Sequence, residues 1–422
     1  MSPPARSGAD HRRATHEGGE ATSAIDADRP RRWGVAGLGR AFTLMLPTLV
    51  ADARVRLVAA ADPRAEARTR FAREFGARAY ASVEALCDDP DVEIVYVATP
   101  HEWHAAHAVL AATRGKHVLV EKPMALTLAD CTRMIEAADA ARVQLVVGHS
   151  HGFDAPIRRA SEIIAGGEVG AVRMVQAFYC TDFLYRPRRP EELDTSRGGG
   201  VVWSQAAHQI DVVRRLCGGA VTRVRALTGN WDAARDTEGA YAALLTFETG
   251  AFASLVYNGY GYFDSDEFCN GTSELGLRKD AASHGAARRA LRDARDEDGE
   301  IAKKYARNYG GSAYRPRDPA TVIGYEHFGT VIVSCDRADL RPMPTGVLVY
   351  DEAGARVETL PPPVIPRRDV IDELYAAIAS GRPALHDGRS ARATLAVCTA
   401  VLESAHEQRD VVPSLQVDAG RR

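Results

Sequence analysis

Residues 31–149 alternate short apolar runs with longer segments that suit helices, and this alternation constrains the fold more than any other feature. Six apolar runs occur, at about 33–36, 55–62, 77–80, 94–98, 118–120 and 144–148. Continuous apolar strands are buried on both faces, and helices between them favour parallel pairing. The sequence therefore predicts an α/β fold that begins with a doubly wound parallel sheet.

The run at 118–120 stops at the triplet Glu121-Lys122-Pro123, which puts a lysine at the carboxyl end of a predicted strand. Ligands of open parallel sheets bind at this edge. On this stretch alone, a surface lysine and a catalytic lysine are equally good interpretations.

A glycine turn follows the first strand, where Gly37-Leu38-Gly39 leads into a helix that begins near Arg40. Strand, glycine turn and helix form the context of a dinucleotide-binding fingerprint. Gly37 would permit the tight turn, and Gly39 would let backbone N–H groups approach a pyrophosphate. The third glycine of the fingerprint is replaced by Phe42, so the match is incomplete.

The second predicted strand ends in Asp62, 23 residues after Gly39. A carboxylate at this spacing is suited to accept hydrogen bonds from the adenosine ribose, which favours NAD. Arg64 could instead hold a 2′-phosphate, so NADP remains an alternative. Asp62 could also simply cap the following helix, and the two roles can coexist.

Three histidines, His101, His104 and His107, follow the fourth strand. On a helix they would spread over roughly 120° of arc, and no carboxylate is placed to complete a metal site. No metal is therefore predicted, and His101 is expected to line a nicotinamide pocket. The cofactor site is expected to be formed by Gly37, Leu38, Gly39, Arg40, Asp62, Arg64, Thr99, Pro100, His101, His104, Glu121 and Lys122.

Composition narrows the function classes. The 422 residues suggest two domains, with 45% hydrophobic and 26% charged residues, as in soluble globular proteins. A net charge of −3 gives no reason to expect nucleic acid or an anionic membrane as a partner, and no apolar run is long enough to span a bilayer. Seven scattered cysteines argue against a disulfide framework, so a reducing, cytoplasmic location is expected. Residues 1–30 are polar and predict a disordered tail.

The region 150–422 is predicted to bind substrate and to mediate oligomerisation. A proline-bounded loop near 181–190 is dense in arginine, which fits either a solvated surface or an anionic substrate site. The side chains expected to contact substrate are His149, the last residue of the first domain, and, in this region, His151, Arg186, Arg188, Arg189, Arg197 and Ser204.

A glycine run at 198–200 opens a helix that carries Ser204, His208 and Asp211. Ser204 and His208 are four residues apart and would share one helical face. His208 is a candidate general base, and a core histidine bonded to Asp211 is an equally good interpretation. Alternating strands follow, and 264–317 reads as a charged surface insertion that is mobile unless ordered by a ligand or subunit.

These motifs together resemble the Gfo/Idh/MocA family of NAD(P)-dependent oxidoreductases over about residues 31–410. The motifs that carry the resemblance are Gly34-x-x-Gly37-x-Gly39, Asp62, Glu121-Lys122-Pro123, Gly198-Gly199-Gly200, His208-x-x-Asp211 and Asp387-Gly388-x-x-Ala391. The resemblance implies an N-terminal Rossmann domain at 31–149 and a C-terminal α/β domain on a large, mainly antiparallel sheet. It also implies assembly into a homodimer or homotetramer through that sheet. Within the site, it implies that Lys122 hydrogen-bonds the reacting hydroxyl and that His208 is the acid/base.

The serine at 204 departs from family members that act on polyols, which usually place an aspartate there. A serine brings no negative charge, so a substrate with its own carboxylates suits this arginine-rich region. Within the family, the chain looks most like phthalate 4,5-cis-dihydrodiol dehydrogenases, which implies oxidation of a phthalate cis-4,5-dihydrodiol to 4,5-dihydroxyphthalate. The alternatives are a dehydrogenase of an inositol or acidic sugar, and an NAD-dependent glycoside hydrolase.

Overall fold

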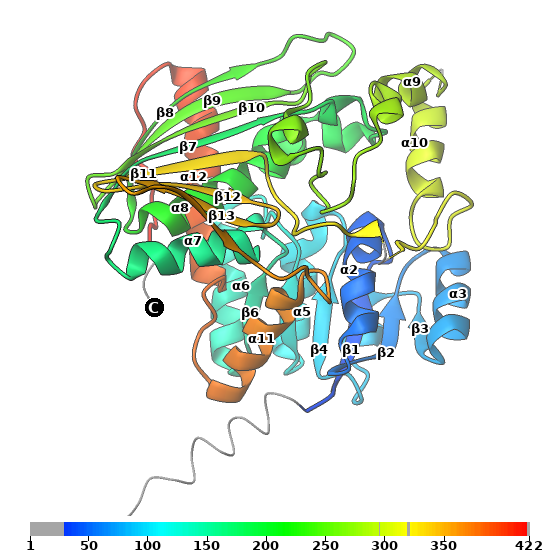
Figure 1. Cartoon of the computed structure of the whole chain (residues 1–422). Coiled ribbons are helices and arrows are strands. Elements are labelled where there is room, and N and C mark those ends of the chain that lie inside the picture. Colours follow the sequence, from blue (N-terminus) through cyan, green and yellow to red (C-terminus); the bar gives the residue numbers. More distant parts are fainter. Residues whose placement is uncertain (1–28, 295, 319–320, 420–422) are drawn as a thin grey trace, which may run out of the picture.

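The computed structural model describes residues 29–294, 296–318 and 321–419 and consists of two sheets with helices packed against them (Figure 1). The predicted disordered tail lies outside the described residues, apart from residues 29 and 30. Within the described ranges, no helix is long and apolar enough to cross a membrane.

The first sheet is the predicted doubly wound parallel sheet of six strands, in the order β3-β2-β1-β4-β5-β6. Its strands are β1 (Arg31–Ala36), β2 (Val55–Ala61), β3 (Arg78–Tyr80), β4 (Ile94–Val97), β5 (His117–Val120) and β6 (Leu145–Val147). Its helices are α2 (Arg40–Ala51), α3 (Ala65–Phe75), α4 (Val83–Cys87), α5 (His104–Thr113) and α6 (Leu128–Ala141). Every residue of β4 is buried, as expected for a strand covered on both faces.

The second sheet has eight strands in the order β14-β13-β12-β11-β7-β10-β9-β8, and only the pair β7 and β10 is parallel. This confirms the large, mainly antiparallel sheet. Its strands are β7 (Val172–Cys180), β8 (Val221–Gly229), β9 (Ala240–Phe247), β10 (Phe252–Asn258), β11 (Thr330–Cys335), β12 (Asp339–Met343), β13 (Gly346–Asp351) and β14 (Gly354–Thr359). Buried and exposed residues largely alternate along β9 and β10, because one face of the sheet is covered and the other is open.

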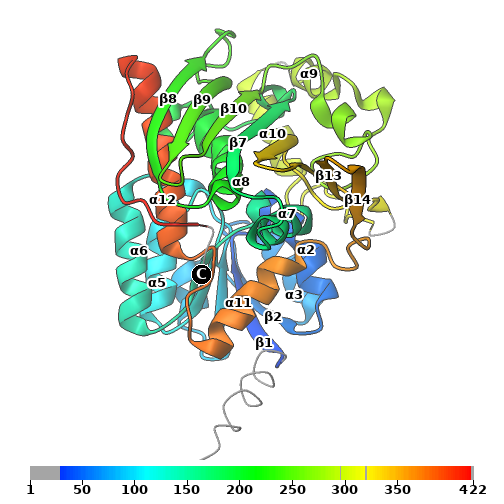
Figure 2. The same cartoon turned by 60° about the vertical axis from the view of Figure 1, so that its left-hand side comes forward.

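Helices from the middle and from the C-terminal part of the chain cover the inner face of this second sheet. They are α7 (Ala155–Ala165), α8 (Ala207–Cys217) and α12 (Gly388–Glu407), while α11 (Arg368–Ser380) packs against the first sheet. Figure 2 shows α12 running from β8 of the second sheet to α6 of the first.

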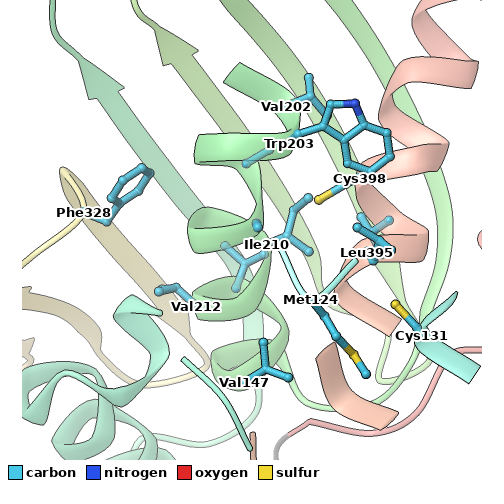
Figure 3. Close-up of a cluster of buried hydrophobic side chains, with 14 of the residues drawn as sticks. Met124, Cys131, Val147, Val202, Trp203, Ile210, Val212, Phe328, Leu395 and Cys398 are labelled. Atoms are coloured by element: carbon cyan, nitrogen blue, oxygen red, sulfur yellow. The ribbon is translucent and has the colours of Figure 1, made fainter. Parts of the chain in front are cut away.

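The two sheets share a hydrophobic core where α8, α12 and the end of the first sheet meet (Figure 3). Met124 and Val147 come from the first sheet's side, Ile210 from α8, and Leu395 and Cys398 from α12. Burying such side chains stabilises the fold by about 1.5–3 kcal/mol each. The shared core therefore holds the two sheets in one arrangement, which matters for the site built between them.

The segment 264–317, predicted as a surface insertion, mixes exposed and buried residues along its length. It contains α9 (Ala286–Arg292) and α10 (Glu297–Ala306). Tyr309, which follows α10, is fully buried, with its ring centroid 5.3 Å from Phe42 and 6.3 Å from Phe71. These contacts return the chain to the first sheet, so the segment forms one wall of the cleft described below.

Candidate active site

Two adjoining cavities lie at the carboxyl edge of the parallel sheet. The cavity lined by Gly37 and Asp62, here the turn cavity, has a volume of about 790 Å³. The cavity lined by Lys122 and His208, here the inter-sheet cavity, has a volume of about 570 Å³. Arg40, Thr99, His101, Glu192 and Lys304 line both cavities, so the two form one continuous cleft.

The glycine turn has the geometry that a dinucleotide requires. Gly37 has φ +93°, and a Cβ on it would lie 2.7 Å from the carbonyl oxygen of Ala98, so no other residue fits without strain. No described atom lies within 4 Å of a Cβ built on Gly39, and Gly39 caps α2 without a side-chain hydrogen bond. The first N–H groups of α2 are therefore open to the turn cavity, as pyrophosphate binding needs.

Asp62 lies at the end of β2, buried beside the turn. Its carboxylate accepts hydrogen bonds from the backbone N–H of Leu38 at 2.8 Å and from the Arg64 Nε at 3.0 Å. Arg64 also donates to the carbonyl oxygens of Leu38 and Tyr309. Asp62, which favours NAD, and Arg64, which could hold the 2′-phosphate of NADP, thus form one ion pair at the wall of the turn cavity.

Lys122 follows β5 and points into the inter-sheet cavity, where its Nζ donates a hydrogen bond to the Ser204 carbonyl oxygen at 2.7 Å. Burial lowers the pKa of Lys122 from its usual value. The neighbouring Glu121 accepts a hydrogen bond from the Tyr96 hydroxyl at 2.5 Å. Burial raises the pKa of Glu121, although Tyr96 and the nearby Arg367 oppose that shift.

His208 lies at the start of α8 on the opposite wall, and only 5% of it is exposed. Burial, with Lys122 and His151 nearby, lowers the pKa of His208 well below its usual value. Its Nδ1 is buried without a hydrogen bond to any described residue. The ring is therefore neutral at neutral pH and is not oriented by a carboxylate.

The predicted alternative for His208, a hydrogen bond to Asp211, does not form. Asp211 instead accepts a hydrogen bond from the Ser150 hydroxyl and pairs with His386 at 3.4 Å. Although burial by itself would raise it, the pKa of Asp211 is lowered to about 2, because His386 and Ser150 stabilise the carboxylate.

Ser204 lies in a π-helical turn, Val202–Ala206, that precedes α8. Its hydroxyl donates to the Gly200 carbonyl oxygen, while its own carbonyl oxygen accepts from Lys122. A π turn shifts the face that each residue presents, so the four-residue spacing to His208 does not have the meaning it has on a regular α-helix. The wider turn leaves a backbone carbonyl free for the lysine.

His101 and His104 lie beside the strand ends but differ in their surroundings. The two ring nitrogens of His104 lie 2.8 Å from the Pro123 carbonyl oxygen and 2.9 Å from that of Thr99, and the residue is fully buried. His104 therefore ties two loops together and has no free nitrogen for a cofactor. His101 lines both cavities, and burial lowers its pKa to about 3. Pro100 lines the turn cavity alone.

His149 and His151 both bond to the carboxylate of Asp154. His149 Nε2 lies 3.1 Å from Asp154 Oδ1, and His151 Nδ1 lies 2.6 Å from Asp154 Oδ2. Both histidines line the inter-sheet cavity, and the rings of His151 and His208 are 4.7 Å apart between centroids.

The structure separates the four arginines predicted to contact substrate. Arg186 and Arg188 line the inter-sheet cavity, whereas Arg189 lines the turn cavity and pairs with Glu191 at 2.9 Å. Arg197 is exposed and lines neither cavity. The loop turns its side chains to different sides, which its sequence does not reveal.

The charge of the inter-sheet cavity is strongly positive. Its lining includes eight cationic side chains and three carboxylates, namely Arg40, Lys122, Arg186, Arg188, Lys304, Arg307, Arg315 and Arg367 against Glu121, Glu192 and Glu274. Loss of hydration and the nearby Arg307 and Arg317 lower the pKa of Arg40 to about 10. Such an arrangement disfavours a cationic ligand and favours an anion.

Sequence reasoning missed several of these residues. Arg367, which lines the inter-sheet cavity, has φ +52° and pairs through its Nη2 with Glu326 at 2.9 Å. Asp154, Glu274 and Lys304 were also missed. Only Asp154, three residues after His151, could have been found from its spacing in the sequence. Glu274, Lys304 and Arg367 come from segments distant in the chain.

No group of three or more histidine, cysteine or acidic residues that could hold a metal ion occurs in the described part of the chain. The parallel sheet with a glycine turn, beside a cavity that holds a lysine and a histidine, defines an NAD(P)-dependent oxidoreductase.

Residues 31–149 match the family model described as an oxidoreductase family with an NAD-binding Rossmann fold, and residues 157–269 match the GFO/IDH/MocA C-terminal domain. The chain belongs to the Gfo/Idh/MocA family, and its first sheet is an NAD-binding Rossmann domain.

The chain is 46% identical over 373 residues to the 1-carboxy-3-chloro-3,4-dihydroxycyclohexa-1,5-diene dehydrogenase of Comamonas testosteroni, covering 88% of this chain and 94% of that protein. A solved structure from Bordetella bronchiseptica RB50 has a TM-score of 0.84 and 42% identity, covering 91% of this chain and all of that one. The WlbA dehydrogenase from Bordetella pertussis, crystallised with NADH and UDP-GlcNAcA, has a TM-score of 0.62 at 21% identity. The match covers 91% of this chain and 99% of the WlbA chain, and this similarity supports the fold alone.

Proposed function

We propose that this dehydrogenase oxidises a cyclic secondary alcohol that carries a neighbouring hydroxyl group and at least one carboxylate. A phthalate cis-4,5-dihydrodiol, oxidised to 4,5-dihydroxyphthalate, is the specific substrate we infer. The single observation that carries this proposal is the excess of cationic side chains around Lys122 and His208. Arginine pairs with carboxylates through two parallel hydrogen bonds, so a dicarboxylate suits this lining better than a neutral sugar.

The relative from Comamonas testosteroni supports the same substrate class. Its name describes a dehydrogenase of a dihydroxycyclohexadiene that carries one carboxylate. The substrate in the relative's name and the substrate proposed here therefore share a ring diol and a carboxylate. They differ in the number of carboxylates.

Lys122 and His208 are the proposed catalytic pair. NAD held at the glycine turn would supply the hydride acceptor, so the hydroxyl group on the oxidised carbon would have to lose its proton. His208 is neutral at neutral pH and is suited to take this proton as a general base. Lys122 is suited to donate a hydrogen bond to the alkoxide as charge develops on it, in a cleft where little water weakens that interaction. The ketone formed from a cis-dihydrodiol becomes an aromatic catechol, which makes oxidation strongly downhill.

Two alternatives remain within the family, and one experiment separates them from this proposal. Absorbance of reduced nicotinamide would be followed with NAD, then NADP, against cis-dihydrodiol carboxylates, inositols and acidic sugars. We expect the fastest reduction with a dihydrodiol carboxylate and NAD. Oxidation of myo-inositol or a uronic acid alone would favour the first alternative. Cleavage of a glycoside without net reduction would favour the hydrolase.

The open face of the second sheet is the proposed subunit interface. Leu227, Leu244 and Phe252 are exposed on it by 63%, 54% and 45%. Apolar side chains gathered on one sheet face suit contact with a second copy of the chain.

A further inference from the structure

The carboxylate of Asp154 bridges two histidines that line the inter-sheet cavity. Its Oδ1 lies 3.1 Å from His149 Nε2, and its Oδ2 lies 2.6 Å from His151 Nδ1. All three residues are at least 93% buried. Asp154 directly precedes α7 but makes no side-chain cap to it, so its carboxylate is available to the two histidines.

An ionised carboxylate only accepts hydrogen bonds, so each histidine must donate an N–H group to it. His149 then carries its proton on Nε2, and His151 carries its proton on Nδ1. A neutral imidazole has one proton, which leaves His149 Nδ1 and His151 Nε2 as acceptors. Neither atom makes a hydrogen bond to a described residue, and the nearest carboxylate oxygen to His151 Nε2 is Glu274 Oε1 at 4.0 Å.

We propose that Asp154 is a specificity-determining residue that acts through His149 and His151, by holding both in the tautomers that present lone pairs to a substrate hydroxyl. This inference rests on the proposed function, because the reacting hydroxyl would be held by Lys122 and His208. The neighbouring hydroxyl would donate to the histidine pair. This pair lies beside the proposed base, since the ring centroids of His151 and His208 are 4.7 Å apart. The residue therefore selects a vicinal diol over a mono-alcohol.

The protonation of this unit predicts how selectivity changes with pH. Burial raises the pKa of Asp154 to about 7 and lowers those of His149 and His151 to about 4. Such a coupled unit titrates as a whole. The other titratable or charged groups that face it from neighbouring elements are His208, Glu274, Glu326, His327 and Arg367.

Above about pH 7 the unit holds one carboxylate and two neutral rings, so both outer nitrogens accept. One added proton converts the Asp154 carboxylate to a carboxylic acid, which donates a hydrogen bond to one of the two histidines. That histidine must then carry its own proton on the nitrogen that faces away from Asp154. One acceptor is lost in that state. For a diol, kcat/KM should therefore rise with pH through about 7.

The test compares Asp154→Asn with Glu162→Gln, a carboxylate-to-amide change at an exposed ion pair on α7, the helix that Asp154 directly precedes. An asparagine amide would donate to one histidine and reverse its tautomer. The substrates are a cis-dihydroxycyclohexadiene carboxylate and the cyclohexadienol carboxylate that differs from it only by lacking the second hydroxyl. We expect Asp154→Asn to lower kcat/KM for the diol roughly 10- to 100-fold, the effect of one mismatched polar contact. The mono-alcohol and the control variant should change little, and the acid limb for the diol should flatten.

Equal losses for the diol and the mono-alcohol, or an unchanged diol kcat/KM, would overturn the proposal while leaving the proposed function intact. If the wild-type protein oxidises neither compound, the proposed function fails instead. The ¹⁵N chemical shifts of labelled histidines then judge the tautomers without catalysis. The inference would be supported if wild-type His149 carries its proton on Nε2 and His151 on Nδ1, and if Asp154→Asn changes the tautomer of one of these rings. Any other wild-type tautomers would reject it. Thermal unfolding of both variants would show whether either substitution causes a folding defect.

Discussion

The Nζ of Lys122 donates a hydrogen bond to the Ser204 carbonyl oxygen across 2.7 Å, although 82 residues separate them in the chain. The contact joins the end of β5 to the π turn before α8 and fixes Lys122 at the wall that carries His208. The carbonyl partner carries no net charge, and the nearby Glu121 and Glu274 favour the charged form of Lys122, so its ammonium group can stabilise a developing alkoxide.

His208→Ala should lower kcat by roughly 10²–10⁴, the usual contribution of general acid–base catalysis, because the variant lacks the proposed general base. NAD affinity, measured by fluorescence titration, should stay within a few-fold of the wild-type value. His406→Ala, at an exposed site on α12, is the matched control and should be silent. A near-normal kcat in the His208 variant would assign the base elsewhere.

Arg186→Ala should raise the KM for a carboxylated dihydrodiol by an amount on the order of 1–3 kcal/mol, as expected for one hydrogen bond to a charged group. Arg186 is 41% exposed, so solvent screening favours the lower end of that range. Arg197→Ala removes an arginine from the same loop region outside both cavities and should leave KM unchanged. A neutral dihydrodiol should bind both variants alike. Equal effects of the two substitutions would contradict a carboxylate site at Arg186.

Asp62→Ala should weaken NAD binding more than NADP binding. The substitution removes an acceptor for the ribose and releases Arg64 from the ion pair, so that the guanidinium becomes free for a 2′-phosphate. Dissociation constants for both cofactors would be measured by fluorescence, with Asp88→Ala at a surface ion pair as control. Equal losses for NAD and NADP would show that Asp62 only supports the turn through Leu38.

His386 should make stability depend on pH in the alkaline range. Burial opposes its charge, but Glu373 and Asp211 raise the pKa of His386 to about 9. Because this value exceeds the unfolded-state pKa near 6.5, the stabilisation is complete below about pH 6.5 and is lost as pH rises through about 9. Urea unfolding should show a loss on the order of 1–3 kcal/mol across that window. In His386→Gln this slope should shrink, and an unchanged slope would refute the assignment.

Leu244→Glu should disrupt self-association if the open sheet face is the subunit interface. A charge at the centre of an apolar contact is costly to bury, so the oligomer should dissociate. Light scattering after size exclusion would measure the mass, with Val364→Glu, exposed outside the sheet, as control. An unchanged mass would place the contact on another surface.

Several features could be read from local sequence alone. The six parallel strands follow from continuous apolar runs, and the turn at Gly37 follows from a backbone conformation that only glycine adopts without strain. The arrival of Lys122 at the carboxyl edge follows from the end of one strand. These features depend on residues within a few positions of each other, which is why pattern and spacing suffice.

Only the tertiary structure decided which side chains meet. Asp211 pairs with His386, 175 residues away, and not with His208 three positions before it. Arg186 and Arg197 look alike in sequence, yet one lines the cavity and the other faces solvent. Such partners are chosen by packing between segments distant in the chain, since burial makes an unpaired charge costly and leaves only a few arrangements that satisfy every buried polar group.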